Sequence, residues 1–332
     1  MGGSRPTTST ERLGRSGILK IAVALVVACA AGTVPAAAHH TTPHQEAVAA
    51  ARAALFEQKD PQTAKRLLEG MWADQPSDGE TLYLLGLAYF LLYEPDKSLP
   101  LLESCRTIES RAGGASNQQD CLYWSGRAHA MKAALAWYYR ESILAGVIKS
   151  RRAMSAALDC YEQVLAKAPD HVGALLSQAE YYMAAPYLPP LAFGDVNKAR
   201  ALVARALTLE PDNPRAHYLQ ARLDLYYNGR RDQARAGYAR VRQLLDTGIG
   251  GVEGILIRRW VDFAQAEVAF LDQDFSATIA YANAYLRQVP DGAEGYALKG
   301  ASLKFIGQQA AGETLIRKAH ELNPHVRRYR EP

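Results

Sequence analysis

One spacing of small and large residues recurs seven times along this chain. In each copy a small residue is followed four positions later by a larger one and seven positions later by another apolar residue. Side chains at these offsets lie on one face of a helix, and in four copies a proline at offset twelve ends that helix. The copies begin at Ala64, Ser98, Ala157, Ala199, Ala234, Ala277 and Gly312. An ordinary amphipathic helix shares the spacing but not its regular recurrence.

Successive copies begin 34, 59, 42, 35, 43 and 35 residues apart. A period of about 34 residues is typical of stacked helical hairpins, each of which buries its apolar face against the next. The first helix of a hairpin carries a small residue three positions before a larger one, as in Gly86 with Tyr89. From Gln45 to Pro324 the chain therefore resembles the tetratricopeptide-repeat (TPR) family. The resemblance implies an all-α fold, a TPR helical-hairpin solenoid of about seven repeats with three insertions.

The longer steps predict three insertions, at 106–156, 184–195 and 246–254. Insertions in repeat proteins form loops or lengthened helices, and function is often located there. The second insertion contains prolines, which exclude a continued helix, and apolar residues such as Leu188, which we expect to dock on another surface. Asp195 is predicted to cap a helix that begins near Val196.

The first 38 residues have the composition of an export signal. Basic residues precede a short apolar run at 21–31, and Ala36 to Ala38 offer a small-residue cleavage site. We therefore expect a cleaved signal peptide at 1–38, a flexible leader at 39–44, and a TPR domain at 45–332 that is soluble in the periplasm. Alternatively, Val26 to Cys29 resemble a bacterial lipoprotein box, in which case Cys29 would be lipidated and would anchor the protein.

The net charge of the exported chain is close to zero. Removing residues 1–38 takes away four basic residues and one acidic residue, which leaves 34 basic and 33 acidic residues. Nucleic-acid binding needs a concentrated basic face, so we do not expect it. The segment 325–330 is basic but short, and we interpret it as a solvated helix end or a frayed tail.

Three cysteines would remain in the exported chain, Cys105, Cys121 and Cys160. In a compartment that permits disulfides, Cys105 at the end of one helix could pair with Cys121 at the start of the next, across a polar loop at 106–120. Such a bridge would contribute about 3 kcal/mol on the chain-entropy model. Alternatively, all three are small buried thiols. Cys160 is unpaired under either interpretation.

The sequence contains no arrangement of residues typical of catalysis, and we expect neither an enzyme nor a cofactor. Asp246 to Gly248 resemble the triplet of aspartic proteases but lack a second copy, and the glycines that follow lack the dinucleotide-binding spacing. His39 and His40, beside a new N-terminus, could chelate copper or zinc. A disordered polar leader explains them more simply, so we predict no metal site.

In TPR proteins the first helices of the hairpins line the concave surface, so the resemblance places candidate binding residues at their inward positions. Most of these are aromatic or apolar, which suits an apolar ligand, an apolar helix or an extended peptide. Alternatively, a tighter superhelix buries them as core. The inward positions are Tyr83, Leu87, Phe90, Tyr123, Arg127, Met131, Leu176, Glu180, Met183, Tyr218, Arg222, Leu225, Tyr226 and Phe305.

The Pro-rich insertion, together with Tyr123 and Trp124 at the start of a long helix, is similar to the T component associated with tripartite ATP-independent periplasmic transporters. The similarity covers about residues 120–223. It implies a periplasmic helical protein that encloses an apolar channel and assists a transport system. The residues that it places along or beside the cavity are Trp124, Met131, Trp137, Tyr138, Tyr182, Tyr187 and Phe193, and Leu191 of the same insertion joins them as a groove candidate.

Two hypotheses for function follow. In the first, a non-enzymatic periplasmic protein holds a lipid-like or other hydrophobic small molecule for a transport or envelope system. In the second, the solenoid is a scaffold for protein–protein interaction in the envelope. The expected partners are an apolar small molecule or lipid, an envelope or transporter protein, or both, with no nucleic acid and with peripheral membrane contact or none.

Overall fold

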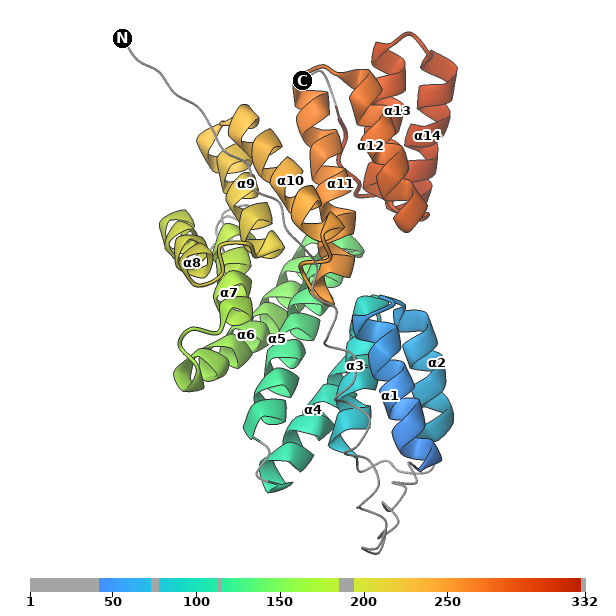
Figure 1. Ribbon diagram of the computed structural model, residues 1–332. Coiled ribbons are helices and arrows are strands. Elements are labelled where there is room, and N and C mark those ends of the chain that lie inside the picture. Colours follow the sequence, from blue (N-terminus) through green and yellow to red (C-terminus); the bar gives the residue numbers. More distant parts are fainter. Residues whose placement is uncertain (1–41, 73–77, 113–114, 185–193, 330–332) are drawn as a thin grey trace, which may run out of the picture. The chain divides into compact units, whose positions relative to one another are not determined.

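The computed structural model describes residues 42–72, 78–112, 115–184 and 194–329. Over these residues the chain forms fourteen α-helices and no β-strand, which confirms the all-α fold (Figure 1). The signal segment with Cys29, and Tyr187, Leu191 and Phe193 of the second insertion, lie outside the described residues. The helices are α1 (Pro43–Phe56), α2 (Pro61–Trp72), α3 (Gly79–Leu91), α4 (Pro95–Ala112), α5 (Ala115–Tyr138), α6 (Ile143–Lys167), α7 (Val172–Ala184), α8 (Val196–Leu209), α9 (Pro214–Asn228), α10 (Arg231–Asp246), α11 (Glu253–Leu271), α12 (Phe275–Gln288), α13 (Ala293–Phe305) and α14 (Gln309–Leu322).

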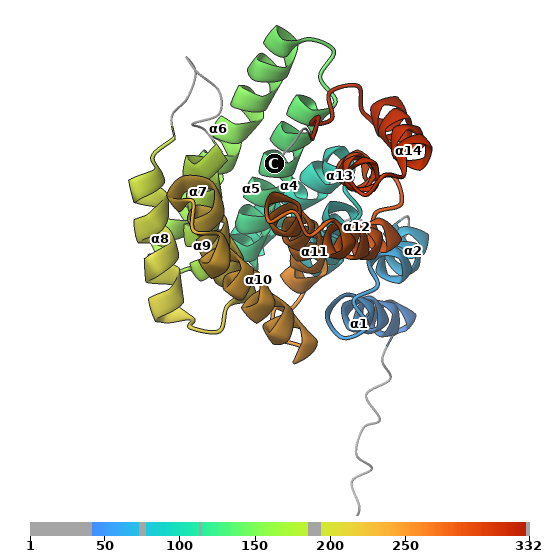
Figure 2. The ribbon, with the colours of Figure 1, turned by 90° about the horizontal axis from the view of Figure 1, so that it is seen from above.

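Consecutive helices pair into seven hairpins, from α1 with α2 to α13 with α14. Figure 2 shows the partners α9 and α10, and α11 and α12, lying side by side. The recurring positions of the second helices face the neighbouring helices: Ala157, Tyr161 and Val164 of α6 are at most 1% exposed. The predicted solenoid of about seven repeats is therefore confirmed. Among the described helices, none combines the length and the hydropathy that a membrane crossing requires.

The small residue at the start of a repeat copy allows two helices to approach closely. Gly300 of α13 faces Gly312 of α14, and a Cβ atom added at Gly300 would lie 2.8 Å from the carbonyl oxygen of Gly312. A Cβ atom added at Gly312 would lie 2.6 Å from the carbonyl oxygen of Gly300. Both distances are shorter than ordinary van der Waals contact, so a larger side chain at either position would push the helices apart.

The first insertion lengthens helices instead of forming a loop. α5 and α6 have 24 and 25 residues, and α4 continues past Cys105. The predicted polar loop at 106–120 is therefore wrong, because that stretch has no proline and its two glycines lie together at 113–114. Cys105 within α4 and Cys121 within α5 are joined by a disulfide, with their Cα atoms 6.2 Å apart.

The ends of the other two insertions follow ordinary turn chemistry. As predicted, Asp195 caps α8, which begins at Val196, by accepting hydrogen bonds from two backbone N–H groups at 3.0 Å. The third insertion forms the loop between α10 and α11. Left-handed φ angles of 88°, 118° and 50° at Gly248, Gly250 and Gly251 explain why this loop is rich in glycine.

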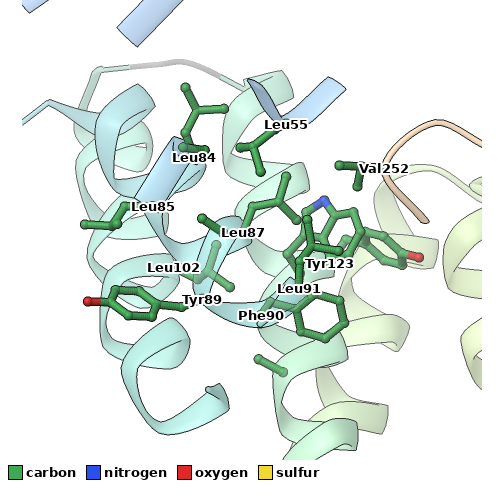
Figure 3. Packing of buried hydrophobic residues seen from close by; sticks show 14 of the residues in the cluster. Leu55, Leu84, Leu85, Leu87, Tyr89, Phe90, Leu91, Leu102, Tyr123 and Val252 are labelled. Atoms are coloured by element: carbon green, nitrogen blue, oxygen red, sulfur yellow. The ribbon is translucent and has the colours of Figure 1, made fainter. Parts of the chain in front are cut away.

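The core joins parts of the chain that are distant in sequence. A cluster of buried apolar residues over the early hairpins includes Leu87, Leu91 and Tyr123, and Val252 at the start of α11 belongs to the same cluster (Figure 3). Trp260 of α11 packs against this cluster and also against the cluster of the middle hairpins. The solenoid therefore brings α11 into contact with hairpins far earlier in the chain.

Candidate functional site

The structure places the predicted groove residues at three depths. The buried side chains are Phe90, Tyr123, Trp124, Arg127, Tyr182, Met183 and Tyr218. The partly exposed side chains are Tyr83, Met131, Trp137, Tyr138 and Arg222. Tyr226 is 36% exposed. Only part of the predicted set therefore offers side-chain surface to a partner.

Three of the buried aromatic residues pack directly against one another. The ring centroids of Phe90 and Trp124 are 5.2 Å apart, as are those of Tyr123 and Trp124, and both pairs meet edge to face. This geometry is favourable for aromatic rings, and it fills the space between them. The contacts favour the core interpretation for these residues, while their role beside an apolar ligand stays a prediction.

A buried network of charged side chains joins the first helices of four consecutive hairpins. Arg215 of α9 is 1% exposed and donates to both carboxylate oxygens of Glu180 of α7, at 3.1 and 2.7 Å. The guanidinium of Arg215 also lies 3.3 Å from the carboxylate of Glu253 of α11, and the guanidinium of Arg127 of α5 lies 2.5 Å from that same carboxylate. Tyr123 of α5 donates its hydroxyl to Glu253 at 2.5 Å. The network thus connects α5, α7, α9 and α11.

Electrostatic attraction keeps both carboxylates of this network ionised. Burial raises the pKa of Glu180 and Glu253, but the Arg215 and Arg127 guanidinium groups outweigh burial, and both pKa values are lowered. Burial, and then the negative charge of Glu253, raise the pKa of Tyr123, so its hydroxyl remains a donor. Two buried cations and two partly buried anions, Glu180 at 26% and Glu253 at 20% exposed, are therefore hydrogen-bonded to each other, an arrangement that becomes costly when one member is removed.

The sequence revealed only part of this network. The repeat spacing marks Tyr123, Arg127 and Glu180 as inward-facing, but not Arg215 or Glu253. Arg215 is the second residue of α9 and Glu253 the first of α11, each directly after a turn. Glu253 contacts Arg215, 38 positions away in the sequence, and Arg127, 126 positions away. A charged residue after a Pro-rich or Gly-rich turn was the available signal, and it is too common to identify a partner.

The C-terminal segment 323–329 is a second feature that the sequence did not predict correctly. It follows α14 as a turn and a non-helical stretch. Val326 is 6% exposed and packs with Ala293 of α13, and the ring of Tyr329 lies 5.6 Å from that of Phe270 of α11. The expectation of a frayed tail is wrong here, because these two apolar side chains pack between helices, whereas the basic side chains Arg327 and Arg328 are exposed as expected.

Glu267 of α11 is the polar anchor of this segment. Its Oε1 accepts hydrogen bonds from Arg327 at 3.2 Å and from the hydroxyl of Tyr329 at 3.3 Å, and its Oε2 accepts one from Tyr226 of α9. Burial, and then the charge of Glu267, raise the pKa of Tyr226 and Tyr329, so both hydroxyls remain donors. Of the predicted groove residues, Tyr226 bonds to Glu267, and Tyr138 of α5 forms a hydrogen bond with Asn323 at the start of the segment.

Three of the hollows on the described surface have volumes of about 460, 480 and 540 Å³, large enough for a small ligand. Each contains at least one basic and one acidic residue, with Arg215 and Glu253 in the first, Arg152 and Asp159 in the second, and Arg242 and Asp246 in the third. A cavity enclosed by apolar side chains alone is not among these three. Within the described ranges, no group of three His, Cys, Asp or Glu side chains could hold a metal ion.

Comparison with known proteins adds similarity at the level of the fold. No protein-family model matches the sequence, and no curated protein sequence does. The structure resembles a thermophilic TPR protein of Thermus thermophilus, with 17% identity over 68% of this chain and 100% of that one and a TM-score of 0.49. It also resembles a TPR protein of Parabacteroides merdae, with 14% identity over 84% of this chain and 93% of that one and a TM-score of 0.47. The chain has a TPR-like helical repeat fold.

Proposed function

We propose that this protein is a non-catalytic scaffold that binds a partner protein through a non-helical segment held against α11 and α13. The observation that carries the proposal is the C-terminal segment 323–329, which occupies that surface in the structure. A surface that holds Val326, Arg327 and Tyr329 of its own chain through side-chain contacts has the chemistry to hold a similar segment of another protein.

The contacts of the C-terminal segment define what a partner segment needs. Glu267 provides a carboxylate for a guanidinium group, and Phe270 provides an aromatic face. Ala293 and Ala297 of α13 form a shallow site for a branched apolar side chain such as that of Val326. A partner segment would therefore carry a branched apolar residue, then a basic residue, then an aromatic residue two positions further on.

A peptide-display selection tests this proposal. The target is the chain with Arg327→Ala and Tyr329→Ala, which weakens the competing contacts of its own tail but leaves α11 and α13 unchanged. We expect the selected peptides to share a basic residue two positions before an aromatic one, and to lose binding when Glu267→Gln is added. Glu162→Gln, an exposed change on α6, serves as the matched control. Selected peptides without a shared pattern, or indifferent to Glu267→Gln, would contradict the proposal.

We further propose that the scaffold acts outside the cytoplasm, and the sequence of residues 1–38 is the support for this. A full-length chain with a C-terminal tag, expressed in a Gram-negative host, should be recovered from the periplasmic fraction. Mass spectrometry should then find an N-terminus at His39. Recovery from the cytoplasm, or a lipid-modified Cys29, would contradict a soluble periplasmic protein.

A further inference from the structure

The joined ends of α5 and α6 expose four large apolar side chains. Tyr139, Ile143, Leu144 and Ile148 are 59%, 69%, 71% and 59% exposed. Together they form one end of a hairpin, in green at the upper edge of Figure 2, which we call the hairpin tip (residues 139–148). Single exposed apolar residues are ordinary, but a contiguous group of this size on a folded surface marks a place of contact with another phase or molecule.

The start of α6 at the hairpin tip is capped. Ser142 caps α6 by accepting a hydrogen bond from the N–H of Ala145 at 3.2 Å, and the N–H of Gly146 bonds to the carbonyl oxygen of Ser142 at 2.9 Å. The offsets of one and five residues from Ile143 to Leu144 and Ile148 place these side chains within one wide arc of the helix. The first turns of α6 therefore present an apolar surface with two of its backbone donors already satisfied.

Aromatic and basic side chains accompany the apolar ones. Trp137 is partly buried at the end of α5, and the guanidinium of Arg140 lies 4.3 Å from the centroid of its ring. Lys149 and Arg152 are exposed on α6, while Glu141 is the one acidic residue among 139–152. The hairpin tip thus combines exposed apolar side chains with an excess of basic ones. Apolar side chains suit the acyl boundary of a bilayer, and basic side chains suit its anionic headgroups.

We propose that the hairpin tip binds the surface of a lipid bilayer that contains anionic headgroups. Ile143, Leu144 and Ile148 enter the acyl boundary, and Lys149 and Arg152 contact the headgroup phosphates. A second copy of this chain is the less suitable occupant, because two such tips would bring like charges together around the apolar contact. His325 of the segment 323–329 lies 2.9 Å from the carbonyl oxygen of Arg140 at the hairpin tip. The proposed lipid contacts use other side chains and do not involve Glu267, so this inference does not depend on the scaffold proposal.

Flotation with lipid vesicles tests the inference. The protein is the chain from residue 39, since residues 43–332 form one compact unit and the apolar run at 21–31 would itself bind lipid. Vesicles of phosphatidylglycerol mixed with phosphatidylcholine are compared with vesicles of phosphatidylcholine alone. We expect the unchanged protein to bind the mixed vesicles. The triple variant Ile143→Ser, Leu144→Ser, Ile148→Ser should bind them at least about tenfold more weakly than the unchanged protein does. Lys149→Gln and Arg152→Gln should each weaken it about fivefold.

The matched control changes two other exposed apolar residues, Leu209→Ser at the end of α8 and Ile306→Ser after α13, which are 39% and 44% exposed. This control should bind vesicles as the unchanged protein does, and circular dichroism checks that every variant is folded. Failure of the unchanged protein to bind the mixed vesicles would overturn the inference, as would equal binding to phosphatidylcholine alone. A dimer in sedimentation that becomes a monomer in the triple variant would overturn it in favour of self-association.

Discussion

Arg215 is a cation held out of water by the carboxylates of Glu180 and Glu253. Replacing it with methionine leaves the two partly buried anions with fewer partners, so we expect the free energy of unfolding to fall by about 3 kcal/mol. Urea denaturation followed by circular dichroism measures this loss. In the control Arg205→Met, which breaks an exposed pair with Asp170, the loss should be below about 1 kcal/mol. Equal losses in the two variants would contradict the account of the network.

The same residues predict a dependence of stability on pH. The folded pKa values of Glu180 and Glu253 are lowered from about 4.5, so below that pH the unfolded state binds more protons than the folded state. The stability that these carboxylates contribute is complete above pH 4.5 or so and is lost as the pH falls through their lowered folded values. We expect the urea midpoint of the unchanged protein to fall more steeply below about pH 4.5 than that of Glu253→Gln. Parallel pH profiles would contradict this.

At the scale of helices, the contact between α13 and α14 depends on two glycines. Gly300→Ala would place a methyl group 2.8 Å from the carbonyl oxygen of Gly312, so we expect a loss of about 1–3 kcal/mol in the free energy of unfolding. Gly70→Ala in α2 is the matched control, because an added Cβ there meets no atom within 4 Å. It should leave stability unchanged or raise it by up to about 1 kcal/mol. A neutral result at Gly300 would show that the helices approach less closely than described.

The disulfide links α4 to α5 and should stabilise the first insertion. Cys105 and Cys121 are 16 residues apart, and a loop of that size corresponds to about 3 kcal/mol on the chain-entropy model. We expect Cys121→Ser to lower the melting temperature, and a reductant to lower that of the unchanged protein to a similar value. Cys160→Ser controls for loss of a thiol, since Cys160 is free. No effect of the reductant would mean that the bridge is absent or does not contribute.

At the scale of the whole molecule, the sequence predicted what depends on local spacing. Ala157, Tyr161 and Val164 are at fixed offsets on one helix, so burial of one of them implies burial of the others. The contact between Arg127 and Glu253 depends instead on the accumulated twist of several hairpins, which no local pattern encodes. This twist decides whether an inward-facing residue such as Tyr123 lines a groove or is enclosed as core.

The C-terminal segment was predicted incorrectly for a related reason. Its charged residues indicated a solvated tail, whereas the position of the segment is set by Val326 and Tyr329, three residues apart. Their apolar contacts come from α11 and α13. The position of the segment can therefore be predicted only after the positions of these helices are known. Of the residues around this segment, sequence reasoning alone had identified Tyr226 and Tyr138.

Binding of the tail as a separate peptide tests the central claim most directly. A fluorescent peptide of residues 323–332 is titrated with the unchanged protein, with Arg327→Ala plus Tyr329→Ala, and with that variant plus Glu267→Gln. Because the unchanged protein already holds its own tail, the double variant should bind the peptide at least about tenfold more tightly, and Glu267→Gln should abolish the gain. Equal binding by all three proteins, or no binding by the double variant, would contradict a partner site on α11 and α13.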